Sequence, residues 1–141
     1  LTEGQPVLPG GVQAQQDTVP LPPAQVRVGR WTLPRWLSRR LVDDDATLSI
    51  VEVDPLVFIG VPCDLTASFG ASVKAAARAI GRHPMIVGFA SDYIGYCVPE
   101  ALYETMRYES LMAFNGPTTG SMVVATLTRM LQQLAGSPDG V

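Results

Sequence analysis

Several residue types and motifs that mark common active sites are scarce or missing in this sequence. Histidine occurs once, at His83 in a turn before Pro84, so histidine catalysis or zinc binding would need partners that this chain does not have. The G-x-S-x-G, Walker A and H-E-x-x-H motifs are absent. Cys63 and Cys97 lie too far apart for a zinc knuckle or a C-x-x-C redox pair, which favours two buried free thiols.

Charged residues and long apolar runs are limited as well. The sequence has 13 acidic and 10 basic residues, a net charge of −3, and the basic residues are scattered. Nucleic acid is therefore not the expected partner. No run approaches the ~20 apolar residues of a membrane-spanning helix. The first residues lack the basic start and apolar centre of a signal peptide, so we expect a chain that is cytosolic, mature or part of something longer.

What the sequence does contain predicts one folded domain. Hydrophobic residues make up 47% of the 141 residues, which is enough for a substantial core. Residues 1–23 are rich in proline and show no periodicity, so we expect either a linker or an extended irregular arm lying on a surface that another segment supplies. We place an α/β domain at residues 24–135 and a frayed tail at 136–141.

The stretch from Leu56 to Ala90 predicts a βαβ unit. Leu56–Val61 is an apolar, β-branched run typical of a buried strand, and Met85–Ala90 reads as the next buried strand. Between them, a helix that begins near Thr66 or Ser68 has a continuous apolar face. The residues of that face are Phe69, Val73, Ala76, Ala77 and Ile80. Two strands joined in this way run parallel.

The flanking segments complete an α/β fold with a mixed sheet. Leu48–Val53 is a further strand, and the Asp54-Pro55 turn after it predicts antiparallel pairing with Leu56–Val61. Gln25–Gly29 alternates like a strand that Trp31 would continue, and Arg35–Leu41 after Pro34 predicts a short helix. A closing helix carries an apolar face made of Val123, Val124, Leu127, Leu131 and Leu134.

Polar and aromatic residues follow both parallel strands. Asp64 comes after the first strand and the segment Ser91–Tyr96 comes after the second, so both should emerge at the carboxyl edge of the sheet, where ligands of α/β proteins bind. Asp64 is either a helix cap or a functional carboxylate. The tyrosines, which are Tyr93, Tyr96, Tyr103 and Tyr108, are either packing residues with solvated hydroxyls or part of a site.

Three motifs here resemble those of the neutral ceramidase family of zinc amidohydrolases. Val61–Thr66 resembles that family's Val-Pro-Gly-Glu-Phe-Thr, and Ser91–Tyr96 is similar to its Asn-Gly-Tyr-x-x-Tyr. Arg107–Glu109, followed by Asn115–Thr119, resembles Arg-Tyr-Glu-Gly-Ala-Ser…Tyr-Gly-Pro-x-Thr. The resemblance runs from about residue 26 to residue 134 and keeps the order and spacing of the motifs.

The resemblance implies a role for four residues. Asp64 stands at the position of a zinc-binding glutamate, and Tyr96 at that of a zinc-binding tyrosine. Tyr108 corresponds to the tyrosine that hydrogen-bonds the scissile amide, and Tyr93 is assigned to substrate binding. Two histidines complete the family's metal site, where zinc lowers the pKa of its bound water to about 7 and polarises the amide carbonyl.

The sequence departs from the family's pattern in three ways. The segment that carries the two histidines, and the Gly-Asp-Val-Ser-Pro-Asn signature, are not in this chain. Asp64 is one methylene shorter than glutamate, which reduces its reach by about 1.5 Å. Cys63 replaces a glycine of the motif, and its thiolate is itself a potential zinc ligand.

The resemblance therefore implies the C-terminal part of a zinc-dependent amidohydrolase that cleaves N-acylsphingosine-type lipid amides. We expect it to be inactive alone, completed by an upstream segment or a second chain, and secreted or at the cell surface. One alternative is a non-catalytic α/β binding module that kept the fold and lost the metal site. Another is a structural domain that forms a homo-oligomer through its apolar excess.

Overall fold

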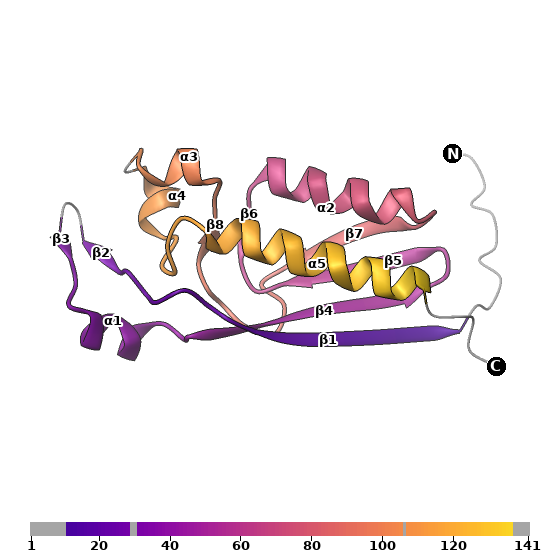
Figure 1. Cartoon of the computed structure of the whole chain (residues 1–141), viewed down its shortest axis with the longest axis horizontal. Coiled ribbons are helices and arrows are strands. Elements are labelled where there is room, and N and C mark those ends of the chain that lie inside the picture. Colours follow the sequence, from indigo (N-terminus) through magenta and orange to yellow (C-terminus); the bar gives the residue numbers. More distant parts are fainter. Residues whose placement is uncertain (1–10, 29–30, 106, 137–141) are drawn as a thin grey trace.

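The structure is a computed structural model that describes residues 11–28, 31–105 and 107–136 (Figure 1). The helices are α1 (Arg35–Leu41), α2 (Ala67–Ala79), α3 (Glu100–Tyr103), α4 (Tyr108–Leu111) and α5 (Thr119–Gly136). The strands are β1 (Val12–Pro20), β2 (Arg27–Val28), β3 (Trp31–Thr32), β4 (Asp45–Val53), β5 (Leu56–Val61), β6 (Asp64–Leu65), β7 (His83–Gly88) and β8 (Tyr96–Cys97). None of the described helices is both long and apolar enough to cross a membrane.

The main sheet has four strands in the order β1-β4-β5-β7. β1 and β5 each pair antiparallel with β4, whereas β5 and β7 run parallel, with Ile59 opposite Ile86. The connection from β5 to β7 passes through α2, so the predicted βαβ unit, the antiparallel turn at Asp54-Pro55 and the mixed α/β sheet are all confirmed.

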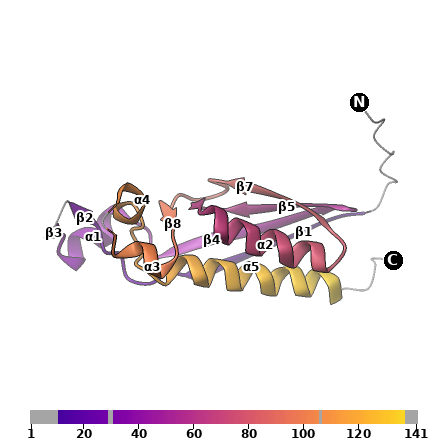
Figure 2. The same cartoon turned by 90° about the horizontal axis from the view of Figure 1, so that it is seen from above.

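Both long helices lie on one face of this sheet, the inner face (Figures 1 and 2). α2 contacts β7 and α5, and α5 contacts β4. Side chains that alternate along the central strands point into this layer, while the apolar faces of α2 and α5 cover them. The fully buried core includes Leu48, Ile50, Val57, Ile59, Val61, Val73, Val123, Leu127, Met130 and Leu131.

β7 is shifted and more exposed than the sequence indicated. It spans His83–Gly88, because Phe89 (φ 57°) adopts a left-handed conformation that ends the strand. The prediction that this strand is buried is wrong: Met85 is 51% exposed and Val87 is 44% exposed. β7 is an edge strand, and α2 covers only one of its two faces.

The N-terminal segment contributes a strand that the sequence pattern did not reveal. Residues 12–20 pair with β4 along their whole length, so this part of the expected arm is an extended edge strand of the sheet. Its inward-facing side chains are largely polar and interact with α5. Gln15 donates a hydrogen bond to Gln133 (2.9 Å), and Arg129 forms an ion pair with Asp17 (2.8 Å). Residues 1–10 and 137–141 lie outside the described residues.

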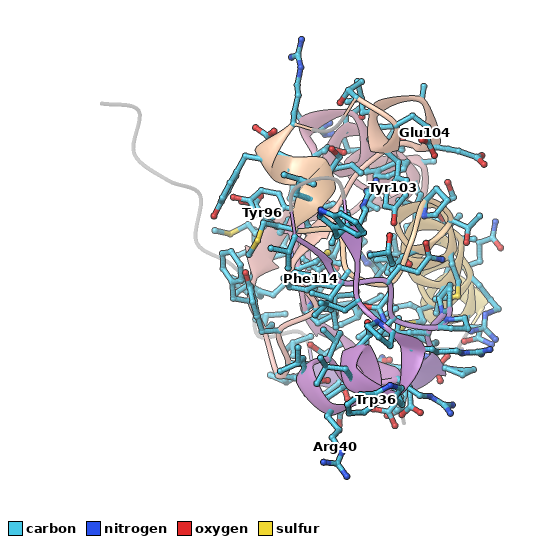
Figure 3. The ribbon with its side chains drawn as sticks, turned by 90° about the vertical axis from the view of Figure 1, so that its left-hand side faces the viewer. Trp36, Arg40, Tyr96, Tyr103, Glu104 and Phe114 are labelled. Carbon is cyan, nitrogen blue, oxygen red and sulfur yellow. The ribbon has the colours of Figure 1, made fainter. Side chains whose placement is uncertain are left out.

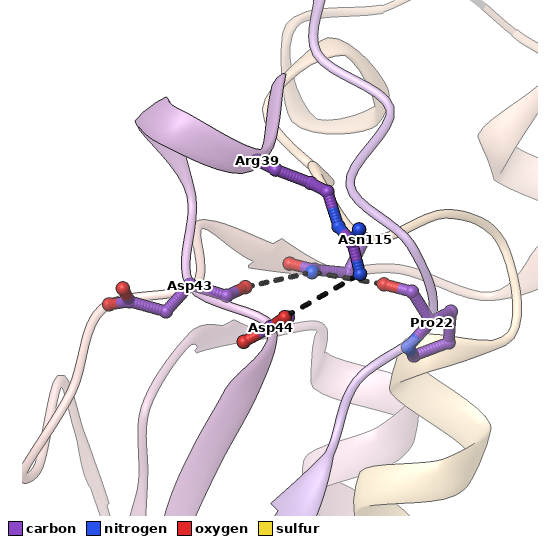
Figure 4. A network of polar contacts seen from close by, with 5 residues as sticks. All are labelled: Pro22, Arg39, Asp43, Asp44 and Asn115. Atoms are coloured by element: carbon purple, nitrogen blue, oxygen red, sulfur yellow. Dashed lines mark hydrogen bonds and ion pairs between the residues drawn. The ribbon is translucent and has the colours of Figure 1, made fainter. Parts of the chain in front are cut away.

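The chain between β1 and β4 is tied to the loop before α5. The side-chain amide of Asn115 donates hydrogen bonds to the backbone carbonyls of Pro22 (3.2 Å) and Asp43 (3.3 Å), next to an Arg39–Asp44 ion pair (Figure 4). Trp31 does not continue the preceding strand. It lies in β3, which folds back antiparallel on β2.

Candidate functional site

The predicted site residues Asp64 and Tyr96 lie directly opposite each other. Beyond the end of β5, β6 pairs in parallel with β8, and the register places Asp64 beside Tyr96. The backbone N–H of Asp64 donates to the carbonyl of Gly95 (2.9 Å), and that of Ile94 donates to the carbonyl of Pro62 (2.8 Å). The convergence expected from two strands that end at one edge is therefore present.

The two side chains also interact. The carboxylate of Asp64 is near enough to the phenol of Tyr96 to act on its ionisation. Loss of solvent around the partly buried ring raises the pKa of Tyr96, and the negative charge of Asp64 and the nearby phenols raise it further. The phenol of Tyr96 therefore stays protonated to a higher pH than an ordinary tyrosine, because the nearby carboxylate of Asp64 disfavours a second negative charge.

Tyr108 joins this pair from a third element. It lies at the start of α4, where its ring meets that of Tyr96 edge to face, with 5.8 Å between centroids and an interplanar angle of 79°. Tyr108 is 63% exposed, so much of this residue remains open to solvent. Figure 3 shows Tyr96 at this end of the molecule, with Trp36 and Arg40 of α1 on the opposite side.

Tyr93 lies in the loop that connects β7 to β8. Its ring contacts Phe89, with centroids 5.8 Å apart, and the two side chains are 53% and 58% exposed. Asp92 fixes this loop to β4 by accepting a hydrogen bond from the backbone N–H of Thr47 (2.7 Å). Tyr93 is close enough to Tyr96 to influence its pKa, so all four predicted site residues belong to one neighbourhood.

Gly95 lets α4 approach the paired strands. Its φ is +80°, and a Cβ at this position would collide with the Met112 carbonyl oxygen and lie 2.9 Å from the Phe114 ring. The adjacent Tyr96 N–H donates to the same Met112 carbonyl (3.0 Å). A glycine is therefore required where the segment carrying Tyr108 meets the segment carrying Tyr96.

The described residues offer two oxygen donors for a metal, Asp64 and Tyr96. His83 pairs with Leu56 at the opposite end of the sheet and does not reach them. Cys63 is fully buried, and its hydrogen bond to Cys97, together with burial, raises the pKa of its thiol, which therefore stays protonated. The described chain contains no group of three or more histidine, cysteine, aspartate or glutamate side chains suited to a metal ion. A carboxylate and a phenol fit part of a zinc site, which ordinarily takes at least three protein ligands.

A small cavity, which no sequence pattern indicated, adjoins this cluster. A volume of about 200 Å³ opens between the start of α2 and the two short helices. The Thr66 hydroxyl at its edge is buried without a hydrogen-bond partner among the described residues, although Thr66 occupies the helix-capping position that its sequence predicted. The cavity is lined by Thr66, Val98, Leu102, Thr105, Arg107, Glu109 and Ser110.

Comparison with solved structures finds this fold within neutral ceramidases. The neutral ceramidase of Pseudomonas aeruginosa matches with a TM-score of 0.73 and 17% identity, over 94% of this chain and 30% of that chain. A ceramidase complexed with C2 matches with a TM-score of 0.60 and 24% identity, over 70% of this chain and 16% of that one. No family model and no curated protein matches the sequence. The resemblance drawn from the motifs is confirmed at the level of fold, and the chain spans less than a third of either ceramidase.

Proposed function

We propose that this chain forms part of a zinc-dependent amidohydrolase of the neutral ceramidase type. The observation that carries the proposal is the pairing of Asp64 with Tyr96 on adjacent parallel strands, with Tyr108 against the Tyr96 ring. These are the positions to which the sequence motifs assign metal and substrate contacts, and the surrounding fold matches that of ceramidases.

Asp64 and Tyr96 would hold the metal through oxygen atoms. Zinc would supply an activated water and polarise the amide carbonyl. Tyr96, whose pKa is raised beside Asp64, would have to lose its phenol proton to bind a cation as a phenolate, so metal uptake at this pair would be coupled to proton release. Asp64 lies on β6, where backbone hydrogen bonds to the segment of β8 hold its main chain in place. These bonds fix the position from which its short side chain would reach the ion.

Tyr108 would act on the substrate. The residue is exposed, and its hydroxyl would donate a hydrogen bond to the amide oxygen as negative charge develops there, or to the departing amine. The exposed rings of Tyr93 and Phe89 provide an aromatic surface next to the pair, suited to the apolar chains of an N-acylsphingosine-type lipid. Tyr93 is accordingly proposed to bind substrate.

The remaining ligands would come from outside this chain. Two histidines, from an upstream segment or a second chain, would complete the zinc site, because two protein ligands rarely retain a catalytic zinc. We expect the isolated chain to be inactive for the same reason. A secreted or cell-surface location and self-association in the complete protein belong to the same proposal.

The test compares the isolated chain with the protein encoded by its full open reading frame. The complete protein should contain one zinc and hydrolyse N-acylsphingosine, whereas the isolated chain should do neither. Loss of an outer-shell partner alone costs about 10–100-fold in metal affinity or activity, so Asp64→Ala and Tyr96→Phe should each cost at least about 100-fold. The controls are Asp44→Ala, away from the pair, and Tyr103→Phe, which removes a phenol hydroxyl but keeps the ring of the cluster that packs against Tyr96, and both should retain zinc and activity.

Two outcomes would contradict the proposal. One is zinc content and hydrolysis that survive Asp64→Ala and Tyr96→Phe at the level of the controls. The other is hydrolysis by the isolated chain that disappears with Asp64→Ala, since this would mean that no outside histidines are needed.

The second candidate is a non-catalytic binding module with the same fold. It is favoured by the presence of only two donors at the site among the described residues and by a Cys63 thiol that is sealed in the core. Absence of zinc uptake by the complete protein, with the fold intact, would support this candidate over the hydrolase.

A further inference from the structure

The sheet has a second apolar face, which no described helix covers. We call it the outer face, and it lies opposite the face that carries α2 and α5 (Figure 2). The strand registers align its side chains in rows that cross all four strands. The rows are Val12, Val53, Leu56 and His83; Ala14, Val51, Phe58 and Met85; and Gln16, Ser49, Gly60 and Val87.

The composition of the outer face differs from that of a sheet face built for water. These three rows contain no lysine, arginine, aspartate or glutamate, and the middle row is apolar from β1 to β7. Antiparallel sheets that face solvent on one side normally alternate to polar residues there. Here Val12 is 70% exposed, and Met85 and Val87 remain about half exposed, at 51% and 44%. A contiguous uncharged apolar face of this kind marks an interaction site.

The outer face continues into the candidate site. The loop after β7 meets this face at Gly60, where a Cβ would lie 3.0 Å from that of Ala90. In the same loop the ring of Phe89 contacts Tyr93, which neighbours Tyr96. The loop between β7 and β8 is also fixed to β4 through the Asp92–Thr47 hydrogen bond. A body that covers the outer face therefore comes to lie beside the Asp64–Tyr96 pair.

We infer that the outer face is the docking surface for the upstream segment that brings the two histidines to Asp64 and Tyr96. This inference rests on the proposed function and names the surface through which the site is completed. The occupant it requires is an uncharged apolar face of that segment, with the histidines at the end nearest Tyr93. The matched region makes up only 30% of the Pseudomonas aeruginosa ceramidase, so most of that chain is available to cover such a face.

A second copy of this chain fits the requirement less well. It could cover the apolar rows, but each copy has a single histidine, His83. The ligand set needs two histidines, and two copies that each complete the other's site would supply one apiece. One upstream segment satisfies both the open face and the missing ligands.

The test starts from the full open reading frame with a protease site inserted before Leu1. After cleavage the two parts should stay together in size-exclusion chromatography. Met85→Lys/Val87→Lys places two charges on the edge strand, where lysine is compatible with folding. Their burial without partners should weaken the association at least about 100-fold. Ser121→Lys/Gln132→Lys places the same charges on exposed positions of α5 and should leave the parts associated.

A second measurement uses the unaltered sequence and does not depend on how the variants fold. The rate at which hydrogen peroxide oxidises Met85 to its sulfoxide should be at least about tenfold lower in the cleaved but associated protein than in the isolated chain, since docking would bury the thioether. Met122, which packs against the core in the isolated chain, should show no such change.

Several results would overturn the inference. The two parts could separate after cleavage, the lysine variant of β7 could associate as well as the control, or Met85 could be oxidised equally fast in both states. The reading frame could lack an upstream segment, or the isolated chain could form dimers that the β7 variant dissociates. None of these readouts requires zinc. Association without zinc or hydrolysis would reject the proposed function and leave the docking surface standing. Zinc-dependent hydrolysis by a complete protein in which Met85 is oxidised as fast as in the isolated chain would reject the docking surface and leave the proposed function standing.

Discussion

The two faces of the main sheet are made from the same kinds of residue and have opposite environments. On β5, Val57 and Ile59 face α2 and α5 and are fully buried, whereas Phe58 between them faces outward and is only partly buried. Burial of apolar area stabilises a fold by about 25 cal/mol per Å². The inner face contributes this energy in full, while the outer face, whose side chains keep part of their area in solvent, contributes less. The alternation of side chains along a strand therefore decides which face each one occupies. Whether that face is buried depends on the helices that pack against it.

The largest effect that separates the faces should come from truncating an inner side chain. Ile59→Ala removes a fully buried side chain between β4 and β7, and we expect it to lower the free energy of unfolding by about 2–5 kcal/mol. Val51→Ala, on the outer face of β4, is the matched control and should cost within about 0.5 kcal/mol in the isolated chain. Urea unfolding measures both. Equal losses would mean that the outer face is already covered in the isolated chain.

A smaller effect should come from the charged residue buried on the inner face. Glu52 is 4% exposed and forms an ion pair with Arg82, which also contacts Asp54 at 3.1 Å. Arg82→Ala leaves the carboxylate without its cation, and we expect a loss of about 1–3 kcal/mol. Arg129→Ala breaks the exposed pair with Asp17 and should cost at most about 1 kcal/mol. Chemical denaturation measures the free energy of unfolding of both variants. A larger loss for Arg129→Ala than for Arg82→Ala would contradict this prediction.

The smallest effect concerns the pair where the outer face meets the site. Because the folded pKa of Tyr96 is raised above the ordinary value of about 10, the unfolded chain ionises this phenol first. Its contribution to stability is therefore complete below about pH 10 and is lost as the pH rises through the folded pKa. Asp64→Asn removes the carboxylate charge, so the pKa of Tyr96 should fall toward its ordinary value.

Absorbance at alkaline pH tests this prediction directly. The difference between the titrations of the unaltered chain and Tyr96→Phe isolates the ionisation of Tyr96, and the same difference in an Asp64→Asn background should be shifted to lower pH. Asp44→Asn is a control for the loss of one negative charge at a distance. An unchanged Tyr96 titration in Asp64→Asn would mean that the two side chains do not interact.

Much of the central fold could be predicted because local pattern and tertiary position agree there. The apolar periodicity of Leu56–Val61 and of α2, with the turn at Asp54-Pro55, was sufficient for the mixed sheet. β1 escaped prediction because its inward-facing residues, such as Gln15 and Asp17, are polar and are satisfied by α5. That information lies more than a hundred residues away in the sequence.

The site was predicted in part for similar reasons. Parallel strands necessarily end at one edge, so the convergence of Asp64 and Tyr96 followed from topology. The contact of Phe89 with Tyr93 did not, because it depends on left-handed backbone at Phe89 and Ser91. The exposure of β7 was missed since an apolar run looks the same in a central strand as in an edge strand with one open face.

The most direct measurement is anomalous diffraction at the zinc absorption edge from crystals of the complete protein. We predict one zinc peak, with an oxygen of Asp64 and the Tyr96 hydroxyl oxygen each at about 2.0–2.2 Å and histidine nitrogens from the upstream segment at about 2.0–2.1 Å. A zinc peak elsewhere, or none at all with Asp64 and Tyr96 still opposite each other on β6 and β8, would contradict the assignment of this pair as metal ligands.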